Sequence, residues 1–388
     1  MRYFYEFILP IFFLFHTTFG DDNSPSLQSQ FCMDLKSRGK NCTLGNALCD
    51  PDLTSYALAG NYTDKCSTDS PFQLDIDQLR LNAARCRNEK SENSKYFWMT
   101  LFVKDDSRNV VEWIVWHLLL GINFITIYDN DSTDNIVKAL EPLVKANLVG
   151  YIPWTGIGIS AQQAAYRDAI EKAQVDKVSW LGIVDVDEFI LPIRDKCLPE
   201  MVSRFDDDKD TAAVVINWRM MPGNYELSHR TAVYQSIFER TEFSLGYPNH
   251  HIKTILKPQL TQNLLTAHAA SYISGYTAVS VDSRRPTNNS FNYPPEVADA
   301  VLLHYHVKSL EEWVAKKDRW RSGMNSKRCP ACHQPLEGVI HDWLAMKKSE
   351  GAHYAREFQR HTNDQTDKKT IEFMKTQAGV MREIITYN

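Results

Sequence analysis

Residues 180–189 read Trp180-Leu181-Gly182-Ile183-Val184-Asp185-Val186-Asp187-Glu188-Phe189. The first five residues are mostly large and apolar, which predicts a buried strand that ends at Val184. Acidic residues follow this strand directly. Because ligands of parallel α/β sheets bind at the carboxyl ends of the strands, the acidic residues are expected at a binding site.

The preceding residues alternate between predicted strands and helices. We expect strands at 96–103, 124–128 and 148–153. We expect helices at 110–120 and at 160–174, and another that follows residues 129–134 and ends near residue 145. Gly121 is expected to end the first helix, and Asp131 or Ser132 to cap the second. This order predicts an α/β fold with a doubly wound, mostly parallel sheet flanked by helices. A second polar cluster, residues 129–134, follows the strand at 124–128 and is expected at the same edge.

The spacing of Asp185 and Asp187 suggests a cation site. In an extended segment, both carboxylates face one cleft, while Val186 and Phe189 anchor the segment in the core. Neighbouring carboxylates repel each other unless a cation or a proton lies between them. Mg²⁺ and Mn²⁺ bind such carboxylates together with phosphate oxygens. The alternative is an acidic turn at the end of the strand, capped by neighbouring amides.

Five ordered blocks between residues 95 and 325 resemble the signature of glycosyltransferase family 92. They are residues 112–121, 128–134, 185–189, 251–258, and 304–309 with Glu311, Glu312 and Trp313. The resemblance does not extend to the N-terminal Cys-rich part or to the C-terminal tail. One departure is Lys104-Asp105-Asp106, where many members carry Lys-Asn-Glu. The role of this loop is open, although its carboxylates remain able to contact a nucleotide.

The resemblance implies a GT-A-like fold, a UDP-sugar donor (often UDP-galactose), dependence on Mn²⁺ (or Mg²⁺), and inversion at the sugar carbon. By motif position, Asp185 and Asp187 are implied to bind the metal and the diphosphate. The loop with Asp129, Asn130 and Asp134 is implied to hold the uridine or the ribose.

A late histidine often completes the metal shell of GT-A enzymes. Here the alternation His304-Tyr305-His306 points both imidazoles the same way. We prefer His306 as the metal ligand, with His304 as the alternative. Lys308 is placed to neutralise phosphate. Against this stands the ordinary role of a histidine as a packed or solvated residue.

Inversion requires a base for the acceptor hydroxyl. Glu226 is the first candidate, because it lies where the family has a Gly-rich acceptor loop. Glu239 and Asp282 are alternatives, and each of the three also fits a surface carboxylate. The aromatic residues Trp154, Trp218 and Tyr225 are expected either to stack on sugars or to pack in the core.

The N-terminus and the cysteines indicate the secretory pathway. An apolar run at residues 7–15 is shorter than the roughly 20 residues of a membrane span. A cleaved signal peptide is expected, with a short signal anchor as the alternative and the only expected membrane contact. Five of the eight cysteines fall within residues 32–86, so at least one pairs elsewhere or stays free. We expect a disulfide-bonded protein that is either type II anchored in the Golgi lumen or secreted.

Four glycosylation sequons occur, and Asn130 is a doubtful one because its loop is expected to face the ligand; the others are Asn41, Asn61 and Asn288. The expected domains are a signal segment (1–20), a Cys-rich stem or subdomain (21–94), a catalytic domain (95–325) and a helical extension (326–388).

Composition and motifs separate the classes of function. The chain is 43% hydrophobic and 23% charged, with a net charge of -5 and no long basic run. This composition argues against nucleic acid as a partner. The leading hypothesis is galactosyl transfer to a glycan acceptor: an N-glycan, a glycolipid or a proteoglycan. The alternatives are a non-catalytic nucleotide-sugar or glycan-binding relative and a metal-dependent phosphohydrolase with Asp185 as nucleophile.

Overall fold

The structure is a computed structural model that describes residues 72–87, 90, 92–221, 247–287, 289–306, 312–313, 316 and 365–387. The helices are α4 (Ile76–Ala83), α5 (Ser107–Leu119), α6 (Ile136–Lys145), α7 (Gly158–Val175), α8 (Leu198–Ser203) and α12 (Gln365–Ile384), with short 3₁₀ turns η1 (Ala84–Cys86), η2 (Tyr247–His250) and η3 (Pro258–Leu260). The strands are β1 (Phe72–Leu74), β2 (Phe97–Val103), β3 (Phe124–Asn130), β4 (Val149–Trp154), β5 (Trp180–Ile183), β6 (Glu188–Pro192), β7 (Thr211–Met220), β8 (Ile252–Leu256), β9 (Thr261–Leu264), β10 (Ala270–Tyr272), β11 (Thr277–Ser280), β12 (Pro286–Thr287), β13 (Ala300–His304) and β14 (Ile385–Tyr387).

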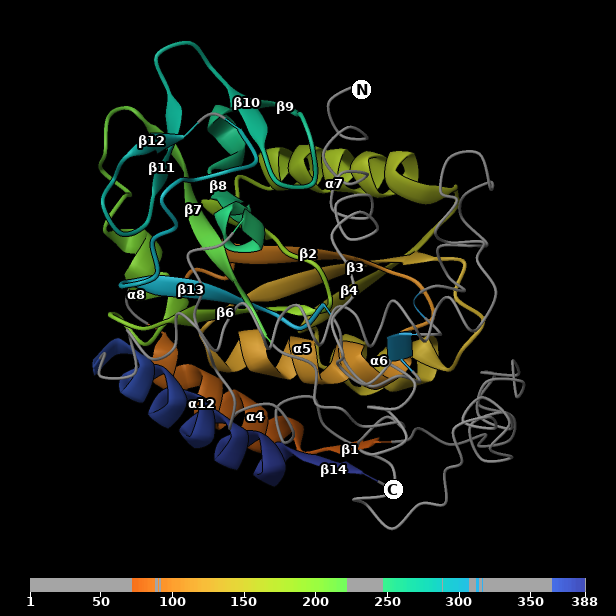
Figure 1. Cartoon of the computed structure of the whole chain (residues 1–388). Helices are drawn as coiled ribbons and strands as arrows, with labels where there is room; N and C mark the ends of the chain where they lie inside the picture. Colours follow the sequence, from red (N-terminus) through yellow and green to blue (C-terminus); the bar gives the residue numbers. More distant parts are fainter. Residues whose placement is uncertain are drawn as a thin grey trace, which may run out of the picture. The chain divides into compact units, whose positions relative to one another are not determined.

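A ten-stranded sheet forms the centre of the fold. Its main path runs β12-β11-β7-β8-β5-β2-β3-β4, and β13 joins β7 to β6. Strands β5, β2, β3 and β4 are parallel, whereas β8 runs antiparallel between β5 and β7. Helix α7 covers one face, and α5 and α6 cover the other (Figure 1). The predicted doubly wound, mostly parallel α/β sheet flanked by helices is confirmed.

The element sequences explain these layers. Helix α6 buries Ile136, Ala139, Leu140 and Leu143, which recur at three- and four-residue spacing and form one apolar stripe. Strands β5, β6 and β8 are buried at every position, as expected where both faces of a sheet are covered.

Gly121 ends α5, as predicted. Its φ of +98° lies in the left-handed region, and an added Cβ would lie 2.6 Å from the carbonyl oxygen of Cys86. Glycine is therefore needed both for the backbone conformation and for the close approach of η1. Cys86 forms a disulfide with Cys197 at the start of α8. One of the five N-terminal cysteines thus pairs outside its own region.

Part of the predicted stem packs on the α/β body. Strand β1 pairs with β14, and Leu79 of α4 is fully buried in the main core. Helices α4 and α12 lie beneath α5, on the side away from the sheet (Figure 1).

The predicted cap of α6 is wrong. The helix begins after Asn135, which makes no capping hydrogen bond through its side chain. The Ser132 hydroxyl instead accepts a hydrogen bond from the backbone N–H of Asp105 at 2.8 Å. Residues 131–134 are drawn toward the loop before α5, so the helix starts later than the sequence suggests.

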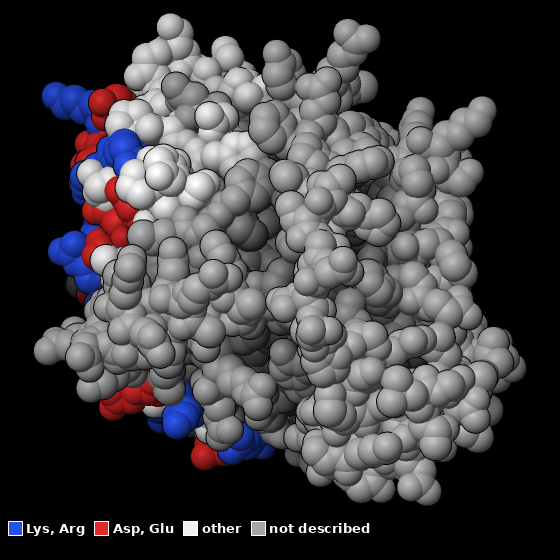
Figure 2. Space-filling view, viewed as in Figure 1, with Lys and Arg blue, Asp and Glu red and all other residues white. Residues whose placement is uncertain are grey.

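Several predicted features lie outside the described residues. They are the segment 1–20, the remaining cysteines, and the residues Asn41, Asn61, Glu226, Glu239, Tyr225, Asn288, Lys308 and Glu311. Within the described part of the chain, no helix is both long and apolar enough to cross a membrane. On the face in Figure 2, the described basic and acidic side chains lie intermixed along one edge.

Candidate active site

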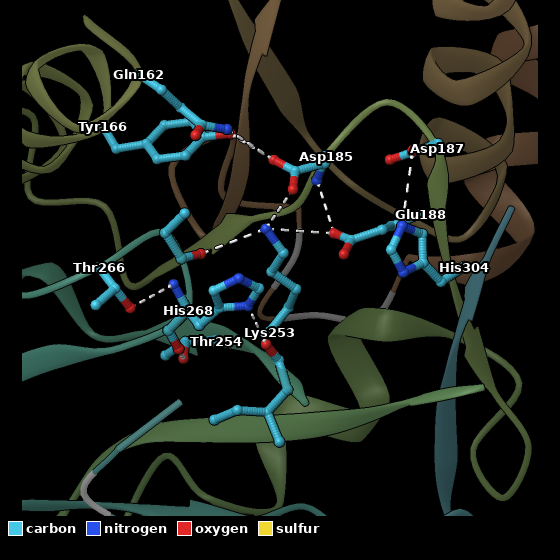
Figure 3. A network of polar contacts seen from close by, with 12 residues as sticks. Gln162, Tyr166, Asp185, Asp187, Glu188, Lys253, Thr254, Thr266, His268 and His304 are labelled. Carbon is cyan, nitrogen blue, oxygen red and sulfur yellow. Dashed lines mark hydrogen bonds and ion pairs between the residues drawn. The ribbon is translucent and has the colours of Figure 1, made fainter. Parts of the chain in front are cut away.

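The acidic motif lies in a turn between β5 and β6. The backbone N–H of Glu188 donates to the carbonyl oxygen of Asp185 at 3.0 Å, so the segment is not extended as predicted. The turn is needed because β5 lies in the main path of the sheet, whereas β6 pairs with β13. As a result, the carboxylates of Asp185 and Asp187 contact different neighbours (Figure 3).

Asp187 lies beside the two predicted histidines. The register of β6 and β13 pairs Glu188 with His304, and the Tyr305 N–H donates to the Asp187 carbonyl at 2.8 Å. One ligand atom each from Asp187, His304 and His306 lies within 4.8 Å of the others. The two strands therefore build one compact donor cluster from two sequence blocks that lie far apart.

The donor cluster fits a divalent ion. One carboxylate and two imidazoles suit a first-row transition ion such as Mn²⁺ better than Mg²⁺, which takes oxygen ligands. Burial lowers the pKa of the His304 imidazole, which favours the neutral form that a metal ligand must have. The Nε2 atom of His304 lies 3.6 Å from Asp187 Oδ2, so a nitrogen lone pair and a carboxylate oxygen face each other in the cluster.

Asp185 lies outside this donor cluster and is held by three other side chains. Its carboxylate accepts hydrogen bonds from Gln162 at 3.1 Å, Tyr166 at 2.9 Å and Lys253 at 2.6 Å (Figure 3). Burial alone would raise the pKa of this carboxyl, but the ammonium of Lys253 outweighs it and holds the pKa below its usual range. Asp185 is thus a fixed negative charge beside the cluster, and its role as a metal ligand stays a prediction.

Lys253 is the residue that sequence reasoning missed at this point. Its side chain is 2% exposed, and its Nζ lies 3.5 Å from a carboxylate oxygen of Glu188, which is fully buried. A signal was present, because Ile252-Lys253-Thr254-Ile255-Leu256 places one lysine in a fully buried strand. A lysine in such a strand requires carboxylate partners.

Helix α5 fixes β6 from the side opposite β13. The indole N–H of Trp113 donates to the Glu188 carbonyl at 2.7 Å, and that of Trp116 donates to the Ile190 carbonyl at 2.8 Å. His117 receives the Ile190 N–H on Nε2 at 3.3 Å and bonds the Trp113 carbonyl through Nδ1 at 2.8 Å. Side chains of α5 thereby satisfy backbone groups that a neighbouring strand would otherwise satisfy. This gives a physical reason for the block at residues 112–121.

The polar side chains of the predicted nucleotide-binding loop, residues 129–134, form hydrogen bonds with other groups of the protein. Asp129 accepts hydrogen bonds from the Tyr151 hydroxyl at 2.6 Å and from the Ser132 N–H at 3.2 Å. Asp134 accepts the Ser107 N–H at 2.8 Å. The Asn130 side chain is 6% exposed and donates to the backbone carbonyls of residues 154 and 156. Any contact of these side chains with a nucleotide stays a prediction.

The departure at residues 104–106 has a structural role. Lys104 donates to the Asn130 carbonyl at 2.9 Å, and Asp105 accepts the Thr133 N–H at 2.6 Å. These bonds join the loop before α5 to the loop before α6, so the two polar loops at this edge form one unit.

Two further candidates have structural partners. The Asp282 carboxylate accepts the N–H groups of Ala298 at 2.6 Å and Asp299 at 3.2 Å, and burial raises its pKa to about 6. Trp154 packs edge-on against Tyr128, in line with core packing.

A row of aromatic rings leads from the donor cluster to the surface. The Trp218 ring lies 4.2 Å from that of His304 and stacks on His251 at 4.5 Å, measured between ring centroids. His251 in turn contacts Phe291 at 4.6 Å, and the side chain of Phe291 is 39% exposed. Beside this row, the exposed ring of Tyr293 packs on His250.

The sequence model of glycosyltransferase family 92 matches residues 99–328, more than half of the chain. The chain belongs to glycosyltransferase family 92. All five sequence blocks and the donor cluster lie inside the matched region. Family 92 relatives include a protein of Ricinus communis, which is 25% identical over 197 residues, 49% of this chain and 34% of the relative. A protein of Oryza sativa subsp. japonica is 30% identical over 91 residues, 23% of this chain and 15% of the relative. The chain thus spans about a third or less of the length of these relatives.

Solved structures show a weak likeness to this family 92 chain. The solved structure of S. aureus TarS 1–349 aligns over 74% of this chain and 91% of the solved TarS chain, at 10% identity and a TM-score of 0.30. The same protein in complex with UDP aligns over the same shares at 12% identity and a TM-score of 0.30. TM-scores this low do not establish a common fold.

Proposed function

We propose that this chain is a metal-dependent, inverting glycosyltransferase that transfers galactose from UDP-galactose to a glycan acceptor. Membership of family 92 supports the reaction class. The observation that carries the proposal is the convergence of Asp187, His304 and His306 where β6 begins and β13 ends. The donor sugar and the inversion follow from the family resemblance of the five sequence blocks.

Asp187, His304 and His306 would hold the ion, with Mn²⁺ preferred over Mg²⁺ because two of the three donors are imidazoles. The bound ion would supply the positive charge that stabilises a departing nucleoside diphosphate. Asp185, held by Lys253, would add a fixed acceptor beside it. Lys308 is proposed to bind phosphate and Glu226 to act as the base.

The row of rings supports a glycan as the acceptor. Flat apolar faces near a polar cluster are suited to the C–H faces and hydroxyl groups of a sugar. Phe291 and Tyr293 are 39% and 71% exposed and lie at the outer end of the row that begins at His304. We place the acceptor sugar over these rings.

The compartment is proposed from the same features. The disulfide between Cys86 and Cys197 suits an oxidising lumen. Together with the N-terminal apolar run, it supports a protein that is either anchored in the Golgi as a type II protein or secreted.

UDP release by the purified chain tests the proposal. UDP-galactose and other UDP-sugars are screened with Mn²⁺ and a mixed glycan pool, with Asp187→Ala as the inactive control. We expect acceptor-dependent release with UDP-galactose, lost in the variant and in chelator, and a product of inverted anomeric configuration by NMR. Phe291→Ala should raise the KM for the acceptor and leave the KM for the donor unchanged.

Each alternative predicts a different result. Donor binding without turnover over the acceptor pool would favour the non-catalytic relative. Phosphate release without an acceptor would favour the phosphohydrolase. Absence of metal-dependent binding of every UDP-sugar would reject the transferase.

A further inference from the structure

The ammonium group of Lys316 lies in the donor cluster formed by Asp187, His304 and His306. The Nζ atom of Lys316 lies 2.8 Å from Asp187 Oδ2 and 3.2 Å from His306 Nδ1. It also donates to the His306 carbonyl at 3.3 Å. The Lys316 side chain is 18% exposed, so this ammonium is substantially withdrawn from water. It therefore contacts two of the three residues that would bind an ion.

The ammonium and a metal ion compete for the same electron pairs. An ammonium group donates hydrogen bonds and cannot accept them, so His306 Nδ1 must be the acceptor in this contact. An imidazole nitrogen has a single lone pair, and it cannot bind an ammonium proton and a metal ion at once. On Asp187, the two cations would share one carboxylate at close range, where their mutual repulsion is strong.

A second residue near Lys316 in the sequence, Trp313, contacts the same cluster. Trp313, one helical turn earlier, is 1% exposed, and its ring lies 5.6 Å from that of His306. The ring of Trp313 is buried against His306, whereas the Lys316 side chain has four rotatable bonds. Release of the donor atoms is therefore easiest by rotation of the Lys316 side chain alone.

We propose that Lys316 occupies the cation site at Asp187 and His306 until a divalent ion displaces it. Metal loading is then an exchange, in which one ion replaces one ammonium group. This inference rests on the metal site of the proposed function and assigns a role to a residue outside the predicted site. Two consequences follow from it. The ion binds less tightly than the donor set alone would allow, and the exchange leaves an ammonium group beside the ion.

The displaced ammonium needs new acceptors. Asp185 already pairs with Lys253 at 2.6 Å, whereas the diphosphate of a nucleotide brings oxygen atoms of its own. The exchange thus predicts that Mn²⁺ and UDP strengthen each other's binding, because UDP provides acceptors for the group that the ion expels. Such coupling would favour entry of the ion together with the nucleotide.

Direct Mn²⁺ binding to the full chain tests the exchange. Loss of the free Mn²⁺ signal in electron paramagnetic resonance gives the affinity without any turnover. Lys316→Met should bind Mn²⁺ about tenfold tighter than the unaltered chain, the size of a charge-assisted hydrogen bond. Saturating UDP should then tighten Mn²⁺ binding by a smaller factor in this variant.

Matched variants isolate the cause. Lys316→Arg keeps the positive charge and should bind Mn²⁺ no tighter than the unaltered chain. Lys172→Met removes one lysine that pairs with Asp168 on α7 and should leave Mn²⁺ affinity unchanged. Circular dichroism checks the fold, and Lys316→Gln, which loses the charge but keeps a donor, replaces the Met variant if that variant does not fold.

Unchanged or weaker Mn²⁺ binding by the folded Lys316 variants would overturn the exchange and leave Lys316 as a support for Asp187. Absence of Mn²⁺ binding by both the unaltered chain and the variants would overturn it as well. UDP release from UDP-galactose decides the transferase separately, because Mn²⁺-dependent transfer would keep the proposed reaction even where the Lys316 variants bind Mn²⁺ no tighter and the exchange fails.

Discussion

Asp185 and Asp187 lie two positions apart, yet their partners predict different roles. Asp187 lies in the donor cluster, whereas Asp185 neutralises Lys253, whose side chain is 2% exposed. Asp187→Asn should therefore abolish Mn²⁺ binding with a smaller effect on stability, because its partner Lys316 is 18% exposed and can turn toward water. Asp185→Asn leaves a buried ammonium with a weaker partner and should lower the free energy of unfolding by about 3 kcal/mol.

Urea unfolding and Mn²⁺ titration of the two variants, side by side, measure this contrast. Equal loss of Mn²⁺ binding in both would show that Asp185 is itself a ligand, as the sequence motif implies. A stable Asp185→Asn protein would show that Glu188 alone is a sufficient partner for Lys253.

His117 makes the stability of the fold depend on pH. Burial lowers the pKa of its imidazole to about 3, from an ordinary value of 6.5. Between these two values the unfolded chain binds a proton that the folded chain does not, so stability falls as pH falls from 6.5 toward 3. The slope is about 1.4 kcal/mol per pH unit for this residue. His268, with its pKa also lowered by burial to about 3, adds to it in the same direction.

Urea unfolding at pH 7, 6 and 5 gives the slope, and His117→Gln should flatten it. A variant with the same slope as the unaltered chain would show that His117 does not cause the pH dependence.

At the scale of elements, α5 determines where the acidic turn lies. Trp113→Phe keeps the ring but loses the hydrogen bond to the Glu188 carbonyl, next to Asp187. We expect a loss of about 1–2 kcal/mol in the free energy of unfolding, because a buried carbonyl is left without a partner. Mn²⁺ binding should weaken as well. Trp98→Phe is the matched control, since it loses an indole bond to Ser94 far from the cluster. Equal Mn²⁺ affinity in both variants would contradict a positioning role for α5.

The end of β3 predicts an unused glycosylation sequon. Asn130 is 6% exposed, and its amide donates to the backbone of the loop before α7. A glycan can be attached to Asn130 only where its side-chain amide is accessible to solvent, so the folded protein should carry no glycan on Asn130. Glycopeptide mass spectrometry of the protein expressed through the secretory pathway of a host cell measures occupancy at each sequon. A glycan on Asn130 would show that β3 ends earlier than Asn130.

At the scale of the whole molecule, local patterns account for the parallel half of the sheet. Strands β2, β3 and β4 are each followed by a helix, and β5 is followed by the acidic turn, so local patterns predict these elements and their order. The antiparallel entry of β8 between β5 and β7 was not predictable in this way, because that pairing joins segments about seventy residues apart. The turn at Asp185 follows from the pairing of β6 with β13, which is equally non-local.

The residues of the site also differ in whether the local sequence predicts them. Residue types and spacing point to Asp187, His304 and His306, because alternation places side chains on one face within a short segment. Lys253 and Lys316 reach the acidic turn from distant segments, and a single lysine has no spacing to mark it. The apolar neighbours of Lys253 indicate a buried lysine, but its carboxylate partners and the role of Lys316 follow only from the fold.

UDP binding measured by isothermal titration calorimetry, with and without Mn²⁺, tests the proposed metal-dependent donor site most directly. We predict that UDP binds in the presence of Mn²⁺, and that chelation or Asp187→Asn abolishes the binding heat. UDP binding of the same strength in chelator, or no UDP binding under either condition, would contradict a donor site built on Asp187, His304 and His306.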